Sequence, residues 1–446
     1  MRSCGFKSHL PHPLGQNQCD SVLFVSEGLQ VMKQDSMIKD RKKEYCYKRL
    51  IPEGECFMKD IKISDAIKYI GVDDADLDLF ESQHMLLNGM AYNSYVILDE
   101  KTAVMETADI RKTEAWRENL LEVLKGRTPD YLIISHMEPD HSANIEMMMR
   151  MFPNLTLVCT VMASNMLKQF FDFELEKDHL IVVKDGDTLC LGEHTLQFIT
   201  APMVHWPEVM MEYEQKEKVM FTADAFGKFG TLDTDEEWDS EARRYYFNIV
   251  GKFGAQVQML LNKVEGLTIN TICPLHGPIL KNNISYYIDK YKVWSSYEAE
   301  DEGVLIACAS IYGHTREAAE KLKLMLEAKG VVNVKIDDLA RGDISAAVAD
   351  AFRYDKMILA AASYEGSVFP CMENFLNRLA HKGYKKRKVA VLENGSWAPS
   401  AGRTMKGILD KMENIRLCSK TVTIKSAMKE KDLADMNEMV DELIGL

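Results

Sequence analysis

The stretch YLIISHMEPDHSAN, residues 131–144, combines a short apolar run with a loop rich in metal-ligand side chains. Tyr131–Ile134 predicts a buried strand, and the motif H-x-E-x-D-H follows it, formed by His136, Glu138, Asp140 and His141. In an extended or looped backbone, alternate side chains share a face, so the first three can converge and the fourth joins as the chain turns. Two imidazoles and two carboxylates in six residues indicate a metal site. The plainer alternative is a solvated acidic loop with two incidental histidines.

Composition narrows the class of protein. The chain has 446 residues, of which 46% are hydrophobic and 27% charged, as in an ordinary globular protein. Its net charge of −14 argues against nucleic acid, an anionic membrane or a strongly acidic protein as the main partner, and is compatible with a small-molecule enzyme. No apolar run approaches the roughly 18 residues of a membrane span.

The ten cysteines are scattered without a C-x-x-C pair, so neither a zinc ribbon nor a disulfide framework is indicated. With no secretory signal in the sequence, we expect free thiols and a cytoplasmic location. Residues 1–57 lack sustained periodicity, and we expect a weakly ordered extension there, with the first domain opening at Met58.

Residues 58–300 predict a β-rich first domain. Strands are expected at 61–70, 90–98, 102–106, 155–161, 180–183, 188–191 and 194–200. Helices are expected at 113–125, 142–151, 162–171, 236–264 and 284–300. Many strands with helices on the outside favour an αββα sandwich.

Three further candidate ligands follow apolar strands later in this domain. His205 lies in PMVHWP, Asp224 ends VMFTAD, and His276 lies in TICPLHGPI. Taken singly, each is an ordinary structural residue. Together with the H-x-E-x-D-H motif they give four histidines and three carboxylates, enough for two metals with one bridging carboxylate.

After Asp301–Gly303, which we expect to be a linker, strands and helices alternate. Strands are expected at 304–309, 331–336, 356–363, 388–393 and 417–424, and helices at 315–329, 343–353, 371–382, 401–412 and 429–444. This alternation predicts a second domain, residues 303–446, with a doubly wound parallel sheet.

Three loops at the carboxyl ends of these strands suit a mononucleotide. The first leads straight into a helix, where hydroxyls and backbone N–H groups favour a phosphate, and the other two offer aromatic faces for a flat ring. The candidate binding residues are Ser310, Ile311, Tyr312, Gly313, His314, Thr315, Ser363, Tyr364, Glu365, Gly366, Asn394, Gly395, Ser396 and Trp397. The alternative is a domain of the same fold with no ligand.

From about residue 58 to the end, these motifs resemble those of the flavodiiron proteins, also called A-type flavoproteins. That family joins a metallo-β-lactamase-like domain to a flavodoxin-like domain. The resemblance implies one iron at His136, Glu138 and His205, a second at Asp140, His141 and His276, and a bridge at Asp224. It also implies that the three loops bind FMN.

Hydrolases with this fold typically carry His where this chain has Glu138. The additional carboxylate favours redox-active iron over zinc. The main alternative is a zinc-dependent metallo-β-lactamase-like hydrolase with an appended flavodoxin domain, which would cleave an ester or thioester. A third class is a flavoprotein electron carrier with an inert metal domain, which the intact ligand set disfavours.

Electron counting indicates the reaction that the resemblance implies. Two ferrous ions and one reduced FMN hold four electrons, enough to take O2 to two waters, while two NO molecules need two electrons to give N2O and water. We therefore expect an O2 or NO reductase acting in oxygen or nitrosative stress defence, with Trp206 a candidate for tuning the choice of gas.

The resemblance also implies partners. A head-to-tail homodimer, or a dimer of dimers, would bring the FMN of one subunit to the irons of the other. Because the sequence shows no rubredoxin-like cysteine pairs and no added flavin reductase domain, we expect an external electron donor such as rubredoxin or a flavin reductase. A deazaflavin coenzyme is a further candidate donor.

Overall fold

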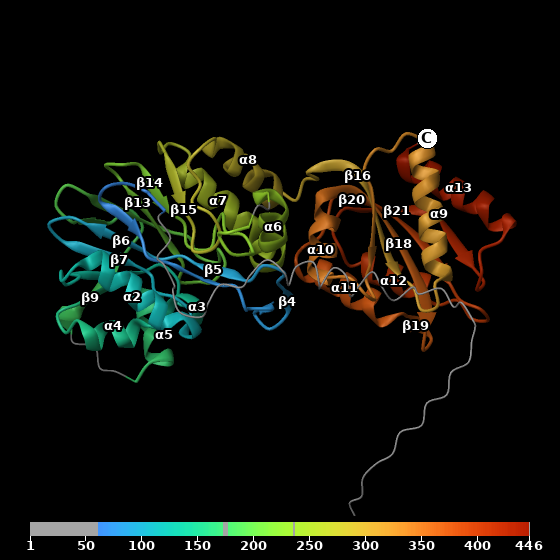
Figure 1. Cartoon of the computed structure of the whole chain (residues 1–446). Helices are drawn as coiled ribbons and strands as arrows, with labels where there is room; N and C mark the ends of the chain where they lie inside the picture. The colour runs from blue at the N-terminus through green and yellow to red at the C-terminus, as the bar shows by residue number, and fades with distance from the viewer. Residues whose placement is uncertain (1–60, 173–176, 235–236, 446) are drawn as a thin grey trace, which may run out of the picture. The chain divides into compact units, whose positions relative to one another are not determined.

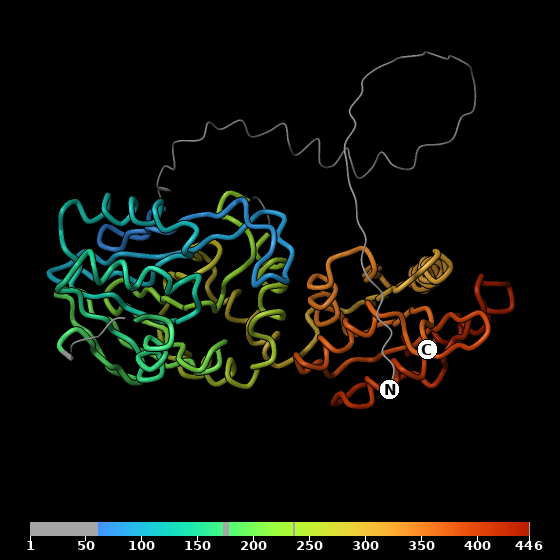
Figure 2. Tube along the Cα trace, turned by 90° about the horizontal axis from the view of Figure 1, so that it is seen from below, coloured from blue at the N-terminus to red at the C-terminus, as the bar shows by residue number. Residues whose placement is uncertain are grey.

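The computed structural model describes residues 61–172, 177–234 and 237–445. The extension 1–57, which we expect to be weakly ordered, lies outside the described residues. The described residues before strand β16 (Asp301–Ala309) form one lobe, and those from β16 onward form a second lobe (Figures 1 and 2).

The first lobe is built on two sheets. The six-stranded sheet has the order β1-β6-β7-β8-β9-β10. Its strands are β1 (Ile67–Tyr69), β6 (Tyr95–Leu98), β7 (Thr102–Met105), β8 (Tyr131–Ile134), β9 (Thr156–Thr160) and β10 (Leu180–Val183). The pairs β1·β6 and β6·β7 are antiparallel, whereas β7 to β10 run parallel. The predicted strand at Tyr131–Ile134 is confirmed as β8.

The second sheet of this lobe has five strands in sequence order. They are β11 (Thr188–Cys190), β12 (Thr195–Thr200), β13 (Met210–Glu214), β14 (Val219–Phe221) and β15 (Thr271–Cys273). Tyr95 and Ile133 of the first sheet share a buried core with Phe198 and Phe221 of the second, so the two sheets pack face to face.

Helices cover the outer faces of both sheets (Figure 1). They are α2 (Thr113–Leu124), α3 (Pro139–Ser142), α4 (Ile145–Met151), α5 (Val161–Phe170), α6 (Trp238–Tyr245), α7 (Gly254–Val264) and α8 (Ile284–Ser295). Trp116 and Leu120 of α2 pack on the first sheet, and Leu260 of α7 and Trp294 of α8 pack on the second. The layers are therefore those of the predicted αββα sandwich.

Short elements complete this lobe. They are β2 (Val72–Asp74) paired with β5 (Met90–Tyr92), the hairpin β3 (Leu79–Phe80) with β4 (His84–Met85), the 3-10 turns η1 (Ile110–Lys112), η2 (Lys177–His179) and η4 (Gly251–Phe253), and the π-helical turn η3 (Tyr246–Val250). Strand β13 and the β3–β4 hairpin were not predicted from the sequence.

Several predicted elements are wrong in extent. The strand expected at 61–70 is only β1, because the Ser64 hydroxyl accepts from the backbone N–H of Ala66 and Ile67 and makes a turn. The helix expected at 142–151 is split between α3 and α4, since the backbone N–H of Asn144 donates to the Thr107 hydroxyl at 3.3 Å. The helix expected at 236–264 is interrupted by η3 and η4.

The second lobe has a parallel sheet in the order β17-β16-β18-β20-β21, which confirms the predicted doubly wound parallel sheet. Its remaining strands are β17 (Val334–Asp338), β18 (Tyr354–Tyr364), β19 (Ser367–Val368), β20 (Arg387–Asn394) and β21 (Ile415–Ile424). Its helices are α9 (His314–Ala328), α10 (Ile344–Arg353), α11 (Pro370–His381), α12 (Ala401–Leu409) and α13 (Glu430–Ile444).

Helices α9 and α13 cover one face of this sheet, and α10, α11 and α12 cover the other. The predicted linker at Asp301–Gly303 is instead the start of β16, because Asp301 pairs with Tyr354 and the Gly303 N–H donates to the Asp355 carboxylate at 2.9 Å.

Candidate metal centre and flavin pocket

The seven candidate ligands come from loops that follow strands of both sheets. His136 follows β8, His205 follows β12, Asp224 follows β14 and His276 follows β15. Glu138 precedes α3, and Asp140 and His141 lie within its single turn. The local expectation of an extended loop is therefore wrong for Asp140, since the chain turns into a helix at Pro139, a residue whose fixed φ suits the first helical position. The expected turn at His141 is confirmed.

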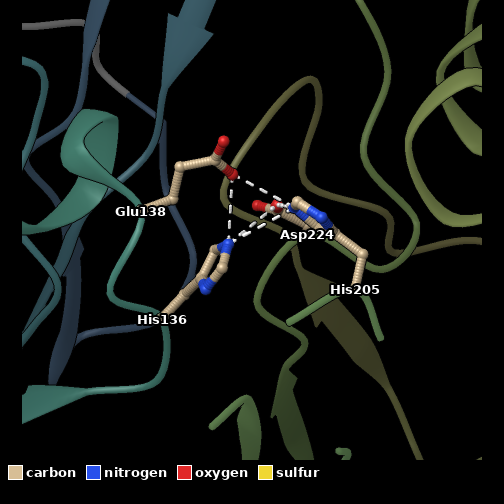
Figure 3. Close-up of side chains that lie close together, drawn as sticks. All are labelled: His136, Glu138, His205 and Asp224. Atoms are coloured by element: carbon tan, nitrogen blue, oxygen red, sulfur yellow. Dashed lines mark hydrogen bonds and ion pairs between the residues drawn. The ribbon is translucent and has the colours of Figure 1, made fainter. Parts of the chain in front are cut away.

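The first ligand group consists of His136, Glu138, His205 and Asp224 (Figure 3). The Nε2 atom of His136 lies 3.2 Å from Glu138 Oε2 and 3.3 Å from His205 Nε2. His205 Nε2 lies 3.1 Å from the same Glu138 oxygen. Three donor atoms from two loops, one after β8 and one after β12, thus face one point.

The second group consists of Asp140, His141 and His276. The two imidazole Nε2 atoms are 3.1 Å apart, and each lies 3.4 Å from Asp140 Oδ2. All three side chains are buried or nearly so.

Asp224 lies between the two groups and presents one oxygen to each. Its Oδ2 is 2.9 Å from His205 Nε2 and 3.5 Å from His136 Nε2. Its Oδ1 is 3.2 Å from His141 Nε2 and 3.6 Å from His276 Nε2. This is the placement that a carboxylate bridging two metals requires.

The donor atoms fit a pair of metal ions. Imidazole nitrogens and carboxylate oxygens bind metals at about 2.0–2.2 Å, which sets neighbouring ligand atoms about 3.0–3.5 Å apart, as observed here. Within the described part of the chain, both Asp140 oxygens and Asp224 Oδ1 are buried without a hydrogen-bond donor. Buried carboxylate oxygens without donors are costly, and bound cations would satisfy them.

The electrostatics of the cluster lead to the same conclusion. Burial disfavours the charged His205 imidazolium, but Asp224 and Glu138 outweigh it and raise the pKa of His205 to about 9. Burial acts to raise the pKa of Asp224, but the charge of His136 and its other histidine neighbours lowers it well below its usual range. Protons therefore hold this cluster together without metal, and metal binding would displace them.

The three predicted loops of the second lobe meet around one cavity of 560 Å³. All the candidate cofactor-binding residues line it except Gly313, which instead caps the start of α9 with a positive φ of 99°. The Ser310 hydroxyl accepts from the Gly313 N–H at 3.1 Å, and the Ser363 hydroxyl accepts from the Ser400 N–H at 2.9 Å. Two helix starts therefore face the cavity, which favours an anionic group.

Two aromatic side chains beside this cavity are almost fully exposed, Tyr312 at 91% and Trp397 at 92%. Exposed rings at the mouth of a polar cavity suit a flat, stacked ring system. Ser426, which follows β21, also lines the cavity and was not predicted. Its N–H donates to the Asn394 amide oxygen at 3.0 Å, a contact made only when the sheet is assembled.

Comparison with known proteins agrees with this two-lobed arrangement. Residues 90–277, which contain all seven candidate ligands, match the family model described as ODP family beta lactamase. Diflavin flavoprotein A 1 of Synechocystis is 32% identical over 308 residues, which make up 66% of this chain and 51% of that protein. The anaerobic nitric oxide reductase flavorubredoxin of Vibrio vulnificus is 27% identical over 354 residues, 76% of this chain and 70% of that protein.

In sequence, the chain is similar to diflavin flavoproteins and to flavorubredoxins. Rubredoxin oxygen:oxidoreductase from the anaerobe Desulfovibrio gigas has the same fold, with a TM-score of 0.80 at 21% identity over 86% of this chain and 97% of that chain. The chain spans about half the length of the diflavin flavoproteins it matches. Among the described residues, no helix is both long and apolar enough to cross a membrane.

Three residues that the sequence analysis did not single out hold the ligands in place. The Glu208 carboxylate lies 2.8 Å from His136 Nδ1 and accepts from the Met137 N–H at 2.9 Å. Glu106 accepts from the His136 N–H at 3.1 Å, and Asn93 donates to the carbonyl of Gly277, beside the last histidine, at 2.8 Å. Such outer contacts fix ligand orientation, yet each links segments far apart in the sequence.

A cavity of 270 Å³ opens onto the centre. It is lined by Leu77, Leu79, Phe80, Glu81, Ser82, Tyr92, Asp109, Arg111, Glu138, Pro139 and Asp140. One ligand carboxylate from each group is therefore on its wall, and the side chains of these two are the most exposed of the seven, at 13% and 10%. The cavity marks the side from which a small molecule can approach.

Proposed function

We propose that this protein is a flavodiiron oxidoreductase that holds two irons at the seven clustered side chains and FMN in the cavity of its second lobe. Its substrates are O2, which it reduces to water, NO, which it reduces to N2O, or both. The observation that carries the proposal is the position of Asp224, whose two oxygens face two separate ligand groups.

The identity of the ligands supports iron over zinc. Glu138 lies within the first group, 3.2 Å from His136 and 3.1 Å from His205, and brings the carboxylates of the centre to three. Harder oxygen ligands favour iron, whereas hydrolases with this fold typically carry His in place of Glu138. The zinc hydrolase alternative therefore lacks support from the geometry of the first group.

When bound, two ferrous ions and one reduced FMN would supply four electrons, which with four protons balance the reduction of one O2 to two waters; two NO need two electrons and two protons to give N2O and water. The chain's own contribution is to orient the ions with seven fixed side chains, exclude bulk water by burying them, and admit a diatomic molecule through the cavity at Glu138 and Asp140.

The names of related proteins support this reaction class. The relative from Vibrio vulnificus is named an anaerobic nitric oxide reductase, and the protein of the same fold from Desulfovibrio gigas is named a rubredoxin oxygen:oxidoreductase. Both names describe reduction of a diatomic gas, and the second includes rubredoxin. We therefore propose an external electron donor, rubredoxin or a flavin reductase, for this protein.

We also propose that the working unit is a head-to-tail homodimer or a dimer of such dimers. Exposed apolar side chains lie beside both cavities. Leu79 is exposed on the wall of the cavity at the metal centre, and Tyr312 and Trp397 are exposed at the flavin cavity. A second copy would cover both patches and bring the FMN of one chain to the irons of the other.

The proposed setting is the cytoplasm, where removal of O2 or NO would defend the cell. The cysteines of the described residues are all free thiols, which fits a reducing compartment: Cys159, Cys190, Cys273, Cys308, Cys371 and Cys418.

The test is anaerobic purification with iron, zinc and flavin quantitation, followed by O2 and NO consumption by the reduced protein. Two irons and one FMN per chain, with rapid loss of either gas, would support the proposal and rank the substrates. Zinc without gas consumption would favour the hydrolase, and FMN without metal would favour an electron carrier.

A further inference from the structure

Tyr92 lies on the wall of the cavity that opens onto the metal centre, although only 1% of the residue is exposed. It belongs to β5, next to Ala91, whose carbonyl lies 2.8 Å from His276 Nδ1. The Tyr92 ring packs edge-on against the His276 ring at a centroid distance of 5.9 Å. Backbone and ring contacts therefore fix Tyr92 relative to the second ligand group.

Within the part of the chain that the structure describes, the Arg111 guanidinium is the one hydrogen-bond partner of the Tyr92 hydroxyl and donates to it at 2.7 Å. Arg111 is itself held by Asp109, whose carboxylate accepts from its Nε at 2.9 Å, and by Asp74 at 3.5 Å. Since Asp74 and Asp109 restrain the guanidinium, the direction of its hydrogen bond to the tyrosine is also restrained.

The hydroxyl uses a lone pair toward Arg111, so its own proton points elsewhere. No group among residues 61–172, 177–234 and 237–445 is placed to accept that proton. The cavity is therefore the space left for an acceptor of the hydroxyl proton.

We propose that the Tyr92 hydroxyl donates a hydrogen bond to the diatomic molecule bound in the cavity beside Glu138 and Asp140, and that Arg111 is the positioning residue that aims it. The inference rests on the proposed function. It assigns Tyr92, which is not a metal ligand, to hydrogen bonding with the bound substrate, and it assigns Arg111 to holding the Tyr92 hydroxyl in place.

Azide serves as the probe, because it is small, anionic and accepts hydrogen bonds. Its dissociation constant is measured by absorbance titration of the oxidised, iron-loaded protein, with iron content determined for every variant. Tyr92→Phe removes only the hydroxyl, so azide should bind about five- to tenfold more weakly at unchanged iron content. The matched control is Tyr213→Phe, which removes a hydroxyl that donates to the Thr268 carbonyl away from the cavity, and should leave azide binding unchanged.

Arg111→Lys keeps the positive charge but loses the planar fork that holds the hydroxyl. It should weaken azide binding about threefold in the wild-type background and less than 1.5-fold in the Tyr92→Phe background, since its effect passes through Tyr92. If Tyr92→Phe does not retain iron, the Arg111→Lys variant still tests the hydroxyl.

Equal azide affinity in wild type and Tyr92→Phe, with equal iron, would overturn the inference while leaving the proposed function intact. Equal effects of Arg111→Lys in both backgrounds would overturn the positioning role. Wild-type protein that holds no iron or binds no azide would overturn the proposed function itself.

Discussion

Removal of the Glu208 carboxylate should release one metal of the pair and leave the other in place. Glu208 is 1% exposed, and one of its oxygens contacts both His136 Nδ1, at 2.8 Å, and the Met137 N–H, at 2.9 Å. His136 belongs only to the first ligand group, so a change in its orientation acts on that metal.

The expected loss of metal affinity follows from the two hydrogen bonds of Glu208. Loss of a carboxylate that orients a ligating histidine weakens metal binding about 10- to 100-fold, which corresponds to roughly 1.4–2.7 kcal/mol. Glu208→Ala removes both hydrogen bonds and should show the full effect. Glu208→Gln keeps an acceptor oxygen in nearly the same volume and should weaken metal binding less than about tenfold.

The assay is iron content per chain after timed exposure to a chelator. Wild type should retain two irons longest. The iron content of Glu208→Ala should fall quickly to one ion per chain, the ion held by Asp140, His141 and His276. The matched control is Glu300→Gln, another buried glutamate, whose loss of its Arg243 ion pair should lower stability without changing iron retention. The reasoning is refuted if Glu208→Ala retains both irons as long as wild type, or loses both together.

Three further outcomes are expected. Glu138→His should keep two metals per chain but shift the ratio of bound iron to zinc several-fold toward zinc, measured by elemental analysis after growth in mixed metals. Burial opposes protonation of His194, but Asp99 at 2.7 Å and Glu217 raise the pKa of His194, so the protonated imidazole stabilises the folded state. This contribution to stability is complete below about pH 6.5 and is lost as the pH rises through the raised pKa. His194→Gln should therefore flatten the fall in melting temperature between pH 6 and 8.5. Trp397→Ala should weaken FMN retention about three- to tenfold, measured by flavin fluorescence on dilution, and an unchanged dissociation constant would argue against stacking.

Local sequence patterns predicted much of the fold because they depend on short-range periodicity. The apolar run at Tyr131–Ile134 is a strand, and the regular alternation after residue 303 gives the observed parallel sheet. Predictions failed where a side chain redirected the backbone. A turn at Ser64 delays the strand expected at 61–70 until Ile67, and the backbone N–H of Asn144 donates to the Thr107 hydroxyl where a predicted helix is split.

The candidate ligands could be chosen from the sequence because each follows a predicted strand and because H-x-E-x-D-H is dense enough to stand out. The groups that support them could not. Glu208, Glu106 and Asn93 are single polar residues in ordinary contexts, and they acquire a role only through contacts with segments brought together by folding. Tyr92 and Arg111 are likewise 19 positions apart and meet only across the cavity wall.

By itself, the sequence determined which residue types are available and where strands end, since both follow from composition and local hydrophobic period. Only the tertiary structure decided that Asp224 presents one oxygen to each ligand group and that the cavity opens beside Glu138 and Asp140. The reason is geometric: the ligands come from loops of two different sheets, and the packing of those sheets, to which residues throughout the lobe contribute, sets the distances between them.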